Sequence, residues 1–129
     1  RLKGVHVITF DANMELLMDR AAGVVAMGGY NTFCEILSLD KRAVLVPRST
    51  PRMEQTLRAR RAASLGLITM LDSEGDRSPQ TMSVTLRALE RQALPSAAGS
   101  NALLSGLEVI CDRVDALLRE RPVHHQDIA

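Results

Sequence analysis

The chain has 129 residues, of which 46% are hydrophobic and 24% charged, and its formal net charge is +1. This length and apolar content suit one domain with a core of its own. The nearly balanced charge and the aromatic content of 2% argue against a nucleic-acid binder, which would present a basic surface with stacking aromatic rings. No apolar run approaches the roughly 20 residues of a membrane-spanning helix, and the first residues do not resemble a signal peptide.

The two cysteines, Cys34 and Cys111, fall in apolar helical patterns. This predicts buried free thiols, which are typical of a reducing compartment such as the cytoplasm. No arrangement of His and Cys has the spacing of a metal site, so we expect neither a metal nor another cofactor.

The first half of the chain alternates short apolar runs with amphipathic patterns. Residues 5–9 predict a first strand, and residues 14–21 predict a helix because their apolar positions recur at helical spacing. Residues 24–27 predict a second strand that is buried on both faces, and residues 30–39 predict a second helix. A third strand is predicted over residues 43–46.

The second half continues the alternation and then becomes helical. A helix is predicted from Pro51 to a cap at Gly66, because proline is tolerated at the first helical position and glycine suits the C-terminal end. Residues 67–71 predict a fourth strand. Two more helices are predicted after it, one that Ser78 caps and one over residues 103–118, the most amphipathic segment of the chain.

This order of elements predicts an α/β fold with a Rossmann-like parallel sheet flanked by helices. Strands that are unbroken apolar runs are typical of parallel sheets covered on both faces. We expect one domain over residues 1–121 and a polar C-terminal tail over residues 122–129.

Two glycines follow the second predicted strand and precede a helix. Gly28 and Gly29 leave room for a ligand, and the first amides of a helix attract anions because they lack partners within the helix. Ligands of parallel sheets also bind at the carboxyl ends of strands. We therefore predict a phosphate or diphosphate site that includes Tyr30, Asn31 and Thr32. A tight turn without any ligand is the alternative.

Thr32 and Glu35 have the spacing of a capping box, in which two side chains satisfy the first amides of a helix. A carboxylate has further acceptor sites, so Glu35 is also suited to the vicinal hydroxyls of a ribose.

Glu54 and Gln55 fall in the first turn of the third predicted helix, at the same edge of the sheet. The helix dipole favours an acid there, and an acid beside an amide also suits hydrogen bonding to sugar hydroxyls. Basic residues are dense in this region and are mostly interpreted as a solvated helix face, with Arg48 and Arg52 best placed to meet a diphosphate. The full set is Lys41, Arg42, Arg48, Arg52, Arg58, Arg60 and Arg61.

The segment Gly28–Glu35 resembles S-G-A-x-T-x-x-E of glycosyltransferase family 28, the family of the peptidoglycan N-acetylglucosamine transferase, in the donor-binding C-terminal half of a GT-B fold. The signature G-G-Y-N-T-x-x-E-I-L over Gly28–Leu37 is similar to that of a group of predicted glycosyltransferases. The similarity extends over about residues 5–71. It includes F-x-x-x-M at Phe10–Met14 and the loop and helix over Pro47–Gly66.

The resemblance implies roles for the site residues. In the family the helix after the glycine turn faces the diphosphate of the donor and the acid binds the ribose, which is Glu35 here. The paired Gln that read the sugar fall on Glu54 and Gln55, so the first position departs from the family pattern. Backbone groups after the Phe bind uracil, which implies a uracil site at Phe10 and Asp11.

The resemblance further implies an inverting, metal-independent transfer from a UDP-sugar, the donor being a substrate and not a cofactor. The first strand and glycine loop of the donor half, and the acceptor half that supplies the catalytic base, have no counterpart in the sequence. We therefore expect a chain truncated at its N-terminus, which binds a donor weakly and is inactive without an acceptor-binding domain. The acceptor, lipid-linked or a small glycoside, stays open, and a lipid-linked one would place the protein at the membrane surface.

Three alternatives remain. The first is a donor-binding subunit of a split two-chain glycosyltransferase. The second is a domain similar to nucleotide-sugar epimerases, and the third is an unrelated α/β module for another phosphate ligand. The last helix is expected to pack against the absent half, and without that half its apolar stripe predicts self-association of the chain.

Overall fold

The computed structural model describes residues 3–72, 75 and 78–120, and the predicted tail over residues 122–129 lies outside them. In chain order the elements are α1 (Met14–Arg20), β1 (Val24–Ala26), α2 (Tyr30–Ser38), β2 (Ala43–Leu45), α3 (Glu54–Ser64), β3 (Thr69–Met70), α4 (Pro79–Leu89), the 3-10 helix η1 (Pro95–Ala98), α5 (Asn101–Leu104) and α6 (Gly106–Glu120).

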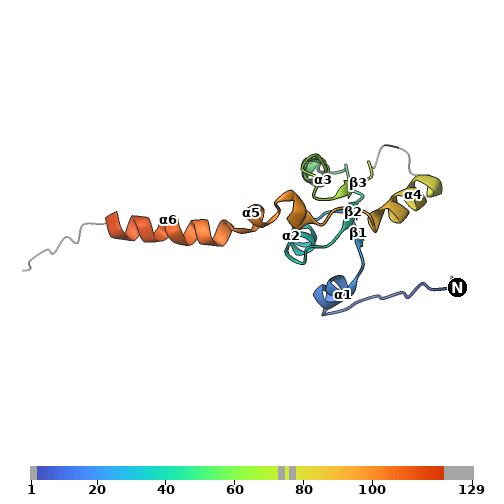
Figure 1. Cartoon of the computed structure of the whole chain (residues 1–129), viewed down its shortest axis with the longest axis horizontal. Helices are drawn as coiled ribbons and strands as arrows, with labels where there is room; N and C mark the ends of the chain where they lie inside the picture. Colours follow the sequence, from blue (N-terminus) through green and yellow to red (C-terminus); the bar gives the residue numbers. More distant parts are fainter. Residues whose placement is uncertain (1–2, 73–74, 76–77, 121–129) are drawn as a thin grey trace, which may run out of the picture.

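The strands form a parallel sheet in the order β1-β2-β3. In Figure 1 the strands lie between α2 and α3 on one side and α4 on the other. The central strand β2 is fully buried, as expected of a parallel strand covered on both faces. The predicted Rossmann-like α/β architecture is therefore confirmed.

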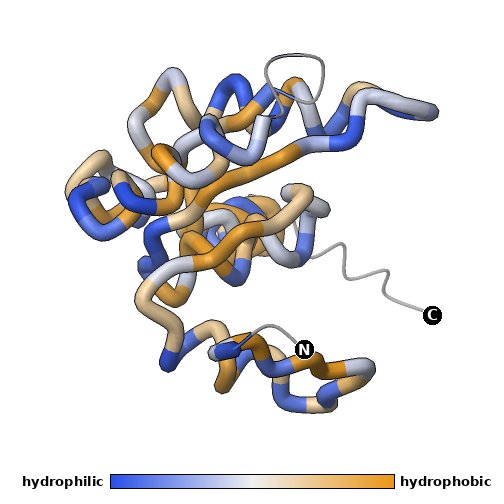
Figure 2. Tube along the Cα trace, turned by 90° about the vertical axis from the view of Figure 1, so that its right-hand side faces the viewer, coloured by the Kyte–Doolittle hydropathy of each residue, from blue (hydrophilic) through white to orange (hydrophobic). Residues whose placement is uncertain are grey.

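The core is aliphatic and lies between β2 and the helices packed on it (Figure 2). Ile36 and Leu37 of α2 enter it from one turn of a helix, and the small Ala59 and Ala62 of α3 allow a close approach to the sheet. This packing fixes α2 and α3 relative to the ends of the strands, which is where the candidate site lies.

The first predicted strand is wrong. Residues 5–9 form no strand, and Val5 and Val7 are 59% and 83% exposed, with His6 exposed between them. The segment runs past α1, away from the sheet (Figures 1 and 2). An apolar run becomes a strand only where a neighbouring edge satisfies its backbone groups, and among the described residues none is paired with it.

The second predicted strand forms, but its predicted burial on both faces is wrong. β1 is an edge strand, and Val25 within it and Met27 after it are 48% and 53% exposed. The exposed face of β1 consequently leaves space beside the turn that follows the strand.

The helix boundaries differ from the prediction in two places. α3 begins at Glu54 instead of Pro51, with Met53 as its N-cap, and the last helix is broken at Ser105 into α5 and α6. By contrast, Gly66 follows α3 with a φ of +73°, and the Ser78 side chain accepts a hydrogen bond of 3.1 Å from the Thr81 amide. These two predicted caps are confirmed.

The prediction of two buried thiols is wrong for Cys111, which is exposed on α6, and Cys34 on α2 is half-buried. α6 extends away from the sheet and its helices (Figure 1), so no part of the core reaches Cys111. None of the described helices combines the length and the apolar character needed to cross a bilayer.

Candidate functional site

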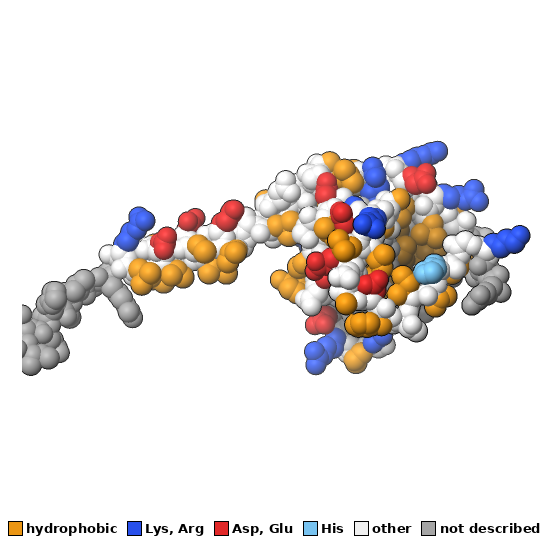
Figure 3. Space-filling model, turned by 90° about the horizontal axis from the view of Figure 1, so that it is seen from below, with side chains coloured by type: hydrophobic (Ala, Val, Ile, Leu, Met, Phe, Trp, Pro, Cys, Tyr) orange, Lys and Arg blue, Asp and Glu red, His pale blue; other side chains and the backbone are white. Residues whose placement is uncertain are grey.

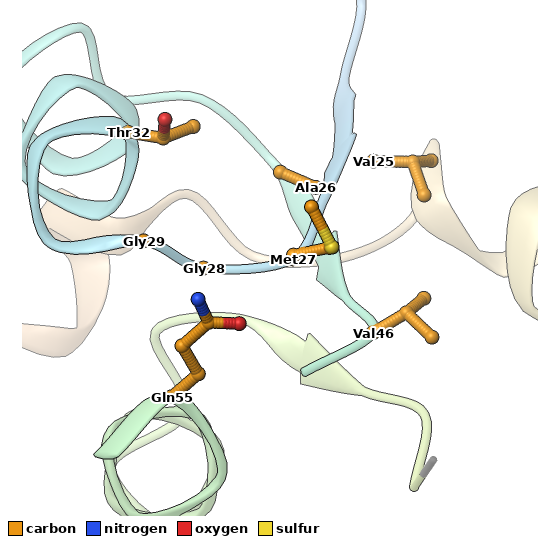
Figure 4. Close-up of a pocket in the computed structure, with 8 residues that line it drawn as sticks. All are labelled: Val25, Ala26, Met27, Gly28, Gly29, Thr32, Val46 and Gln55. Atoms are coloured by element: carbon orange, nitrogen blue, oxygen red, sulfur yellow. The ribbon is translucent and has the colours of Figure 1, made fainter. Parts of the chain in front are cut away.

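A pocket of about 550 Å³ opens at the carboxyl ends of β1 and β2 (Figure 4). It combines the glycine turn after β1, the first turn of α2 and the start of α3, so segments that are separated in the sequence converge on it. Its lining residues are Val25, Ala26, Met27, Gly28, Gly29, Thr32, Val46 and Gln55.

The two glycines of the turn differ in whether the protein itself requires a residue without a side chain. Gly28 has a φ of +77°, and a Cβ added to it would lie 3.0 Å from Cδ1 of the buried Leu45, so this position requires glycine. Gly29 has a φ of −54° and no atom within 4 Å of an added Cβ. The space beside Gly29 is therefore open to a ligand and is not needed by the protein itself.

The N-terminus of α2 has no side-chain cap. Gly29 is the N-cap, no side chain caps the helix, and the amides of Tyr30, Asn31 and Thr32 have no acceptor among the described residues. These amides carry the partial positive charge of the helix end. The arrangement suits an anion, since a phosphate oxygen would supply the acceptors that the protein leaves out.

The predicted capping box is wrong. Thr32 is the third residue of α2, so its backbone is helical and its side chain cannot serve as the N-cap. Glu35 lies one turn further into the helix, where it is half-buried and does not line the pocket. Its carboxylate makes no hydrogen bond within the described part of the chain, which leaves it available to a ligand.

Gln55 is held in a defined orientation. Its Oε1 accepts a hydrogen bond of 3.2 Å from the Arg48 amide, and its side chain points toward the Gly28–Gly29 turn (Figure 4). The buried Thr56 fixes the same loop, because its Oγ1 donates to the Arg48 carbonyl at 3.3 Å. With its oxygen engaged by the backbone, Gln55 presents its NH₂ group to the pocket as a donor.

The other predicted site residues lie around or outside the pocket. The Arg48 guanidinium is 4.0 Å from the sulfur of Met27, which places it at the rim, whereas Arg52 and Glu54 are exposed and do not line the pocket. Phe10 is 85% exposed, and Asp11 is engaged locally, accepting a hydrogen bond of 2.7 Å from the Asn13 amide. Neither of these two residues lines the pocket.

Arg58 was not singled out from the sequence. Its Nη1 donates a hydrogen bond of 2.9 Å to the Gly28 carbonyl, and its guanidinium lies 5.6 Å from the centre of the Tyr30 ring. This contact is not predicted from the sequence, because the basic residues of this region are interpreted mostly as a solvated helix face. The spacing of three residues from Gln55 is the signal that places both side chains on the same face of α3.

Across the described residues, no three His, Cys, Asp or Glu side chains lie close enough together to hold a metal ion. Two basic side chains contact residues of the pocket: Arg58 contacts the glycine turn, and Arg48 lies at the rim.

Comparison with known families shows that residues 2–114 match the glycosyltransferase family 28 C-terminal domain. No curated protein and no solved structure gives a significant match. The family match spans most of the chain, including the sheet, the glycine turn and the start of α3, which carries Gln55. The chain, with its anion-suited helix end at the strand termini, therefore belongs to the C-terminal domain family of family 28 glycosyltransferases.

Proposed function

We propose that this chain is the donor-binding domain of an inverting glycosyltransferase that uses a UDP-sugar and needs no metal ion. The observation that carries the proposal is the uncapped N-terminus of α2 behind a glycine turn, facing an open pocket in a family 28 domain. The donor's diphosphate supplies the acceptors that the helix end lacks.

The remaining roles rest on the family resemblance and on the chemistry of the side chains. The amides from Gly29 to Thr32 bind the diphosphate, Arg48 and Arg52 add positive charge near it, and Glu35 binds the ribose hydroxyls. Gln55 donates to the sugar from inside the pocket.

Other assigned residues also lie outside the pocket and contact parts of the donor that extend beyond it. Glu54 neighbours Gln55 at the start of α3 and acts on the sugar with it. Phe10 and Asp11 bind the uracil through backbone groups, which requires their segment to approach the pocket.

The chemistry is a direct displacement at the anomeric carbon. An acceptor hydroxyl forms the new C–O bond as the bond to the diphosphate breaks, UDP leaves, and a base outside this domain takes the hydroxyl proton. The domain contributes orientation of the sugar and stabilisation of the negative charge on the leaving diphosphate by amides and arginine. It acts with an acceptor-binding domain in the cytoplasm, and is inactive without that domain.

Calorimetry tests the proposal on the chain as it stands. Titration with UDP, UDP-N-acetylglucosamine, GDP and ATP is expected to give the tightest binding for the uridine compounds. Binding of UDP is expected to be the same with and without EDTA, because amides replace a metal at the diphosphate. A preference for ATP would reject the uridine donor, and a requirement for Mg²⁺ or Mn²⁺ would reject the metal-free site.

A further inference from the structure

The peptide group between Gly28 and Gly29 is flanked by glycine on both sides. Neither residue has a Cβ, so sterics alone do not fix which way the carbonyl and the N–H of this peptide point. The two orientations have opposite consequences for an anion. One presents an N–H donor to it, and the other presents the negative end of a carbonyl dipole.

Arg58 selects one of these orientations. Its guanidinium donates to the Gly28 carbonyl at 2.9 Å, so this carbonyl points at α3. The peptide is trans, and the N–H of Gly29 therefore points the opposite way, away from the guanidinium. A hydrogen bond from a charged donor is among the stronger ones in proteins, which makes the contact an effective lock on the turn.

The same guanidinium also braces the residue that follows the turn. It lies 5.6 Å from the centre of the Tyr30 ring, a distance typical of a cation–π contact. Arg58 thus touches both sides of Gly29, the carbonyl before it and the side chain after it. Nowhere in the described chain does a carboxylate pair with Arg58, so its positive charge is not neutralised there.

We propose that Arg58 is a positioning residue for the diphosphate site: it locks the Gly28–Gly29 peptide with its N–H available to the ligand, and its positive charge lies behind that peptide. The inference deepens the proposed function and rests on it for the identity of the ligand. It assigns the turn's geometry to a side chain on α3, 30 residues away along the chain.

The test compares Arg58→Gln with Arg61→Gln. Both variants remove one positive charge from α3, but Arg61 is exposed in the last turn of the helix and does not line the pocket. Each is titrated with inorganic pyrophosphate and with UDP. We expect the dissociation constants of Arg58→Gln to rise about tenfold, because the variant loses a charged hydrogen bond and the fixed orientation of the turn that this bond provides. Those of Arg61→Gln should change less than about twofold, since exposed charges are well screened.

Two spectroscopic signals separate positioning from a general effect on the fold. Tyr30 is the only tyrosine and the chain has no tryptophan, so its fluorescence reports the contact with Arg58 directly. The amide resonance of Gly29 reports the orientation of the turn. Both are expected to change in Arg58→Gln and to remain as in the unmodified chain in Arg61→Gln. Arg58→Lys, which keeps the charge and a donor, should recover part of the affinity and serves if Arg58→Gln does not fold.

Each outcome has one meaning. Equal affinities for Arg58→Gln and Arg61→Gln, or an unchanged Gly29 resonance, would overturn the positioning role while leaving the proposed function intact. Binding of pyrophosphate but not UDP, with the loss in Arg58→Gln preserved, would reject the proposed function and support the role of Arg58. An unmodified chain that binds neither ligand would reject both.

Discussion

At the scale of single residues, the adjacent glycines of the turn serve two purposes that mutation can separate. Gly28→Ala would force a left-handed backbone on alanine and push its Cβ to 3.0 Å from Leu45. We expect the free energy of unfolding to fall by about 1–3 kcal/mol, the usual cost of such a conformation. Gly29→Ala should leave it within about 0.5 kcal/mol, because a weaker N-cap is offset by the lower entropy of the unfolded chain.

For UDP affinity we expect the opposite ranking: among folded protein, Gly29→Ala should lose more affinity than Gly28→Ala. The methyl group of Gly29→Ala enters the open space beside the α2 amides, so UDP affinity is expected to fall about tenfold or more, as when a polar contact to a charged group is lost. Denaturant unfolding and calorimetry on both variants provide the two measurements. Undiminished UDP affinity in Gly29→Ala would mean that the ligand does not approach the backbone there.

At Glu35 the effect of mutation on ligand binding can also be separated from its effect on stability, because this side chain does not cap α2. We expect Glu35→Gln to weaken UDP binding about tenfold while changing stability by less than about 0.5 kcal/mol. Titration with 2′-deoxy-UDP is the matched control, since a ligand without the 2′-hydroxyl should lose less affinity on the same substitution. A drop in unfolding temperature with unchanged affinity would make Glu35 structural.

At the scale of elements, the alternation of strands and helices could be predicted because it depends on local chemistry. Apolar runs, Ser78 before Pro79 and Gly66 after α3 define β2, α4 and the end of α3 almost where they lie. The strand predicted over residues 5–9 failed for a non-local reason. A strand needs a partner edge, and the pattern of a single segment does not reveal whether one is available.

The same division applies to the site. Gly28 and Gly29 could be predicted because a turn from strand to helix is local, and Gln55 because it follows a loop at the same edge of the sheet. The contact of Arg58 with the Gly28 carbonyl could not, because it depends on how closely α3 packs beside the turn. Thr32 is predicted as the N-cap of α2, but the N-cap is Gly29, three residues earlier. The sequence pattern does not reveal this, because glycine can occupy the N-cap position without a capping side chain.

At the scale of the whole molecule, the chain consists of a packed α/β body and the helix α6, which extends from it (Figure 1). One side of α6 is an apolar stripe and the other side carries the charges (Figure 3). The stripe residues repeat at spacings of four and three, the pattern of a helix-pairing seam. They are Leu107, Ile110, Val114 and Leu117, each between 47% and 74% exposed.

The stripe predicts association between copies of the chain, because a seam of this spacing fits a second seam of the same kind and each buried Leu or Ile contributes about 1.5–3 kcal/mol. Ile110→Glu should lower the weight-average mass in sedimentation at high protein concentration. Val109→Glu, at an exposed position of α6 outside the stripe, is the control and should not. Neither variant should alter unfolding of the α/β body, whose core contains no residue of α6. Identical sedimentation of both variants and the unmodified chain over a wide concentration range would rule out pairing through α6.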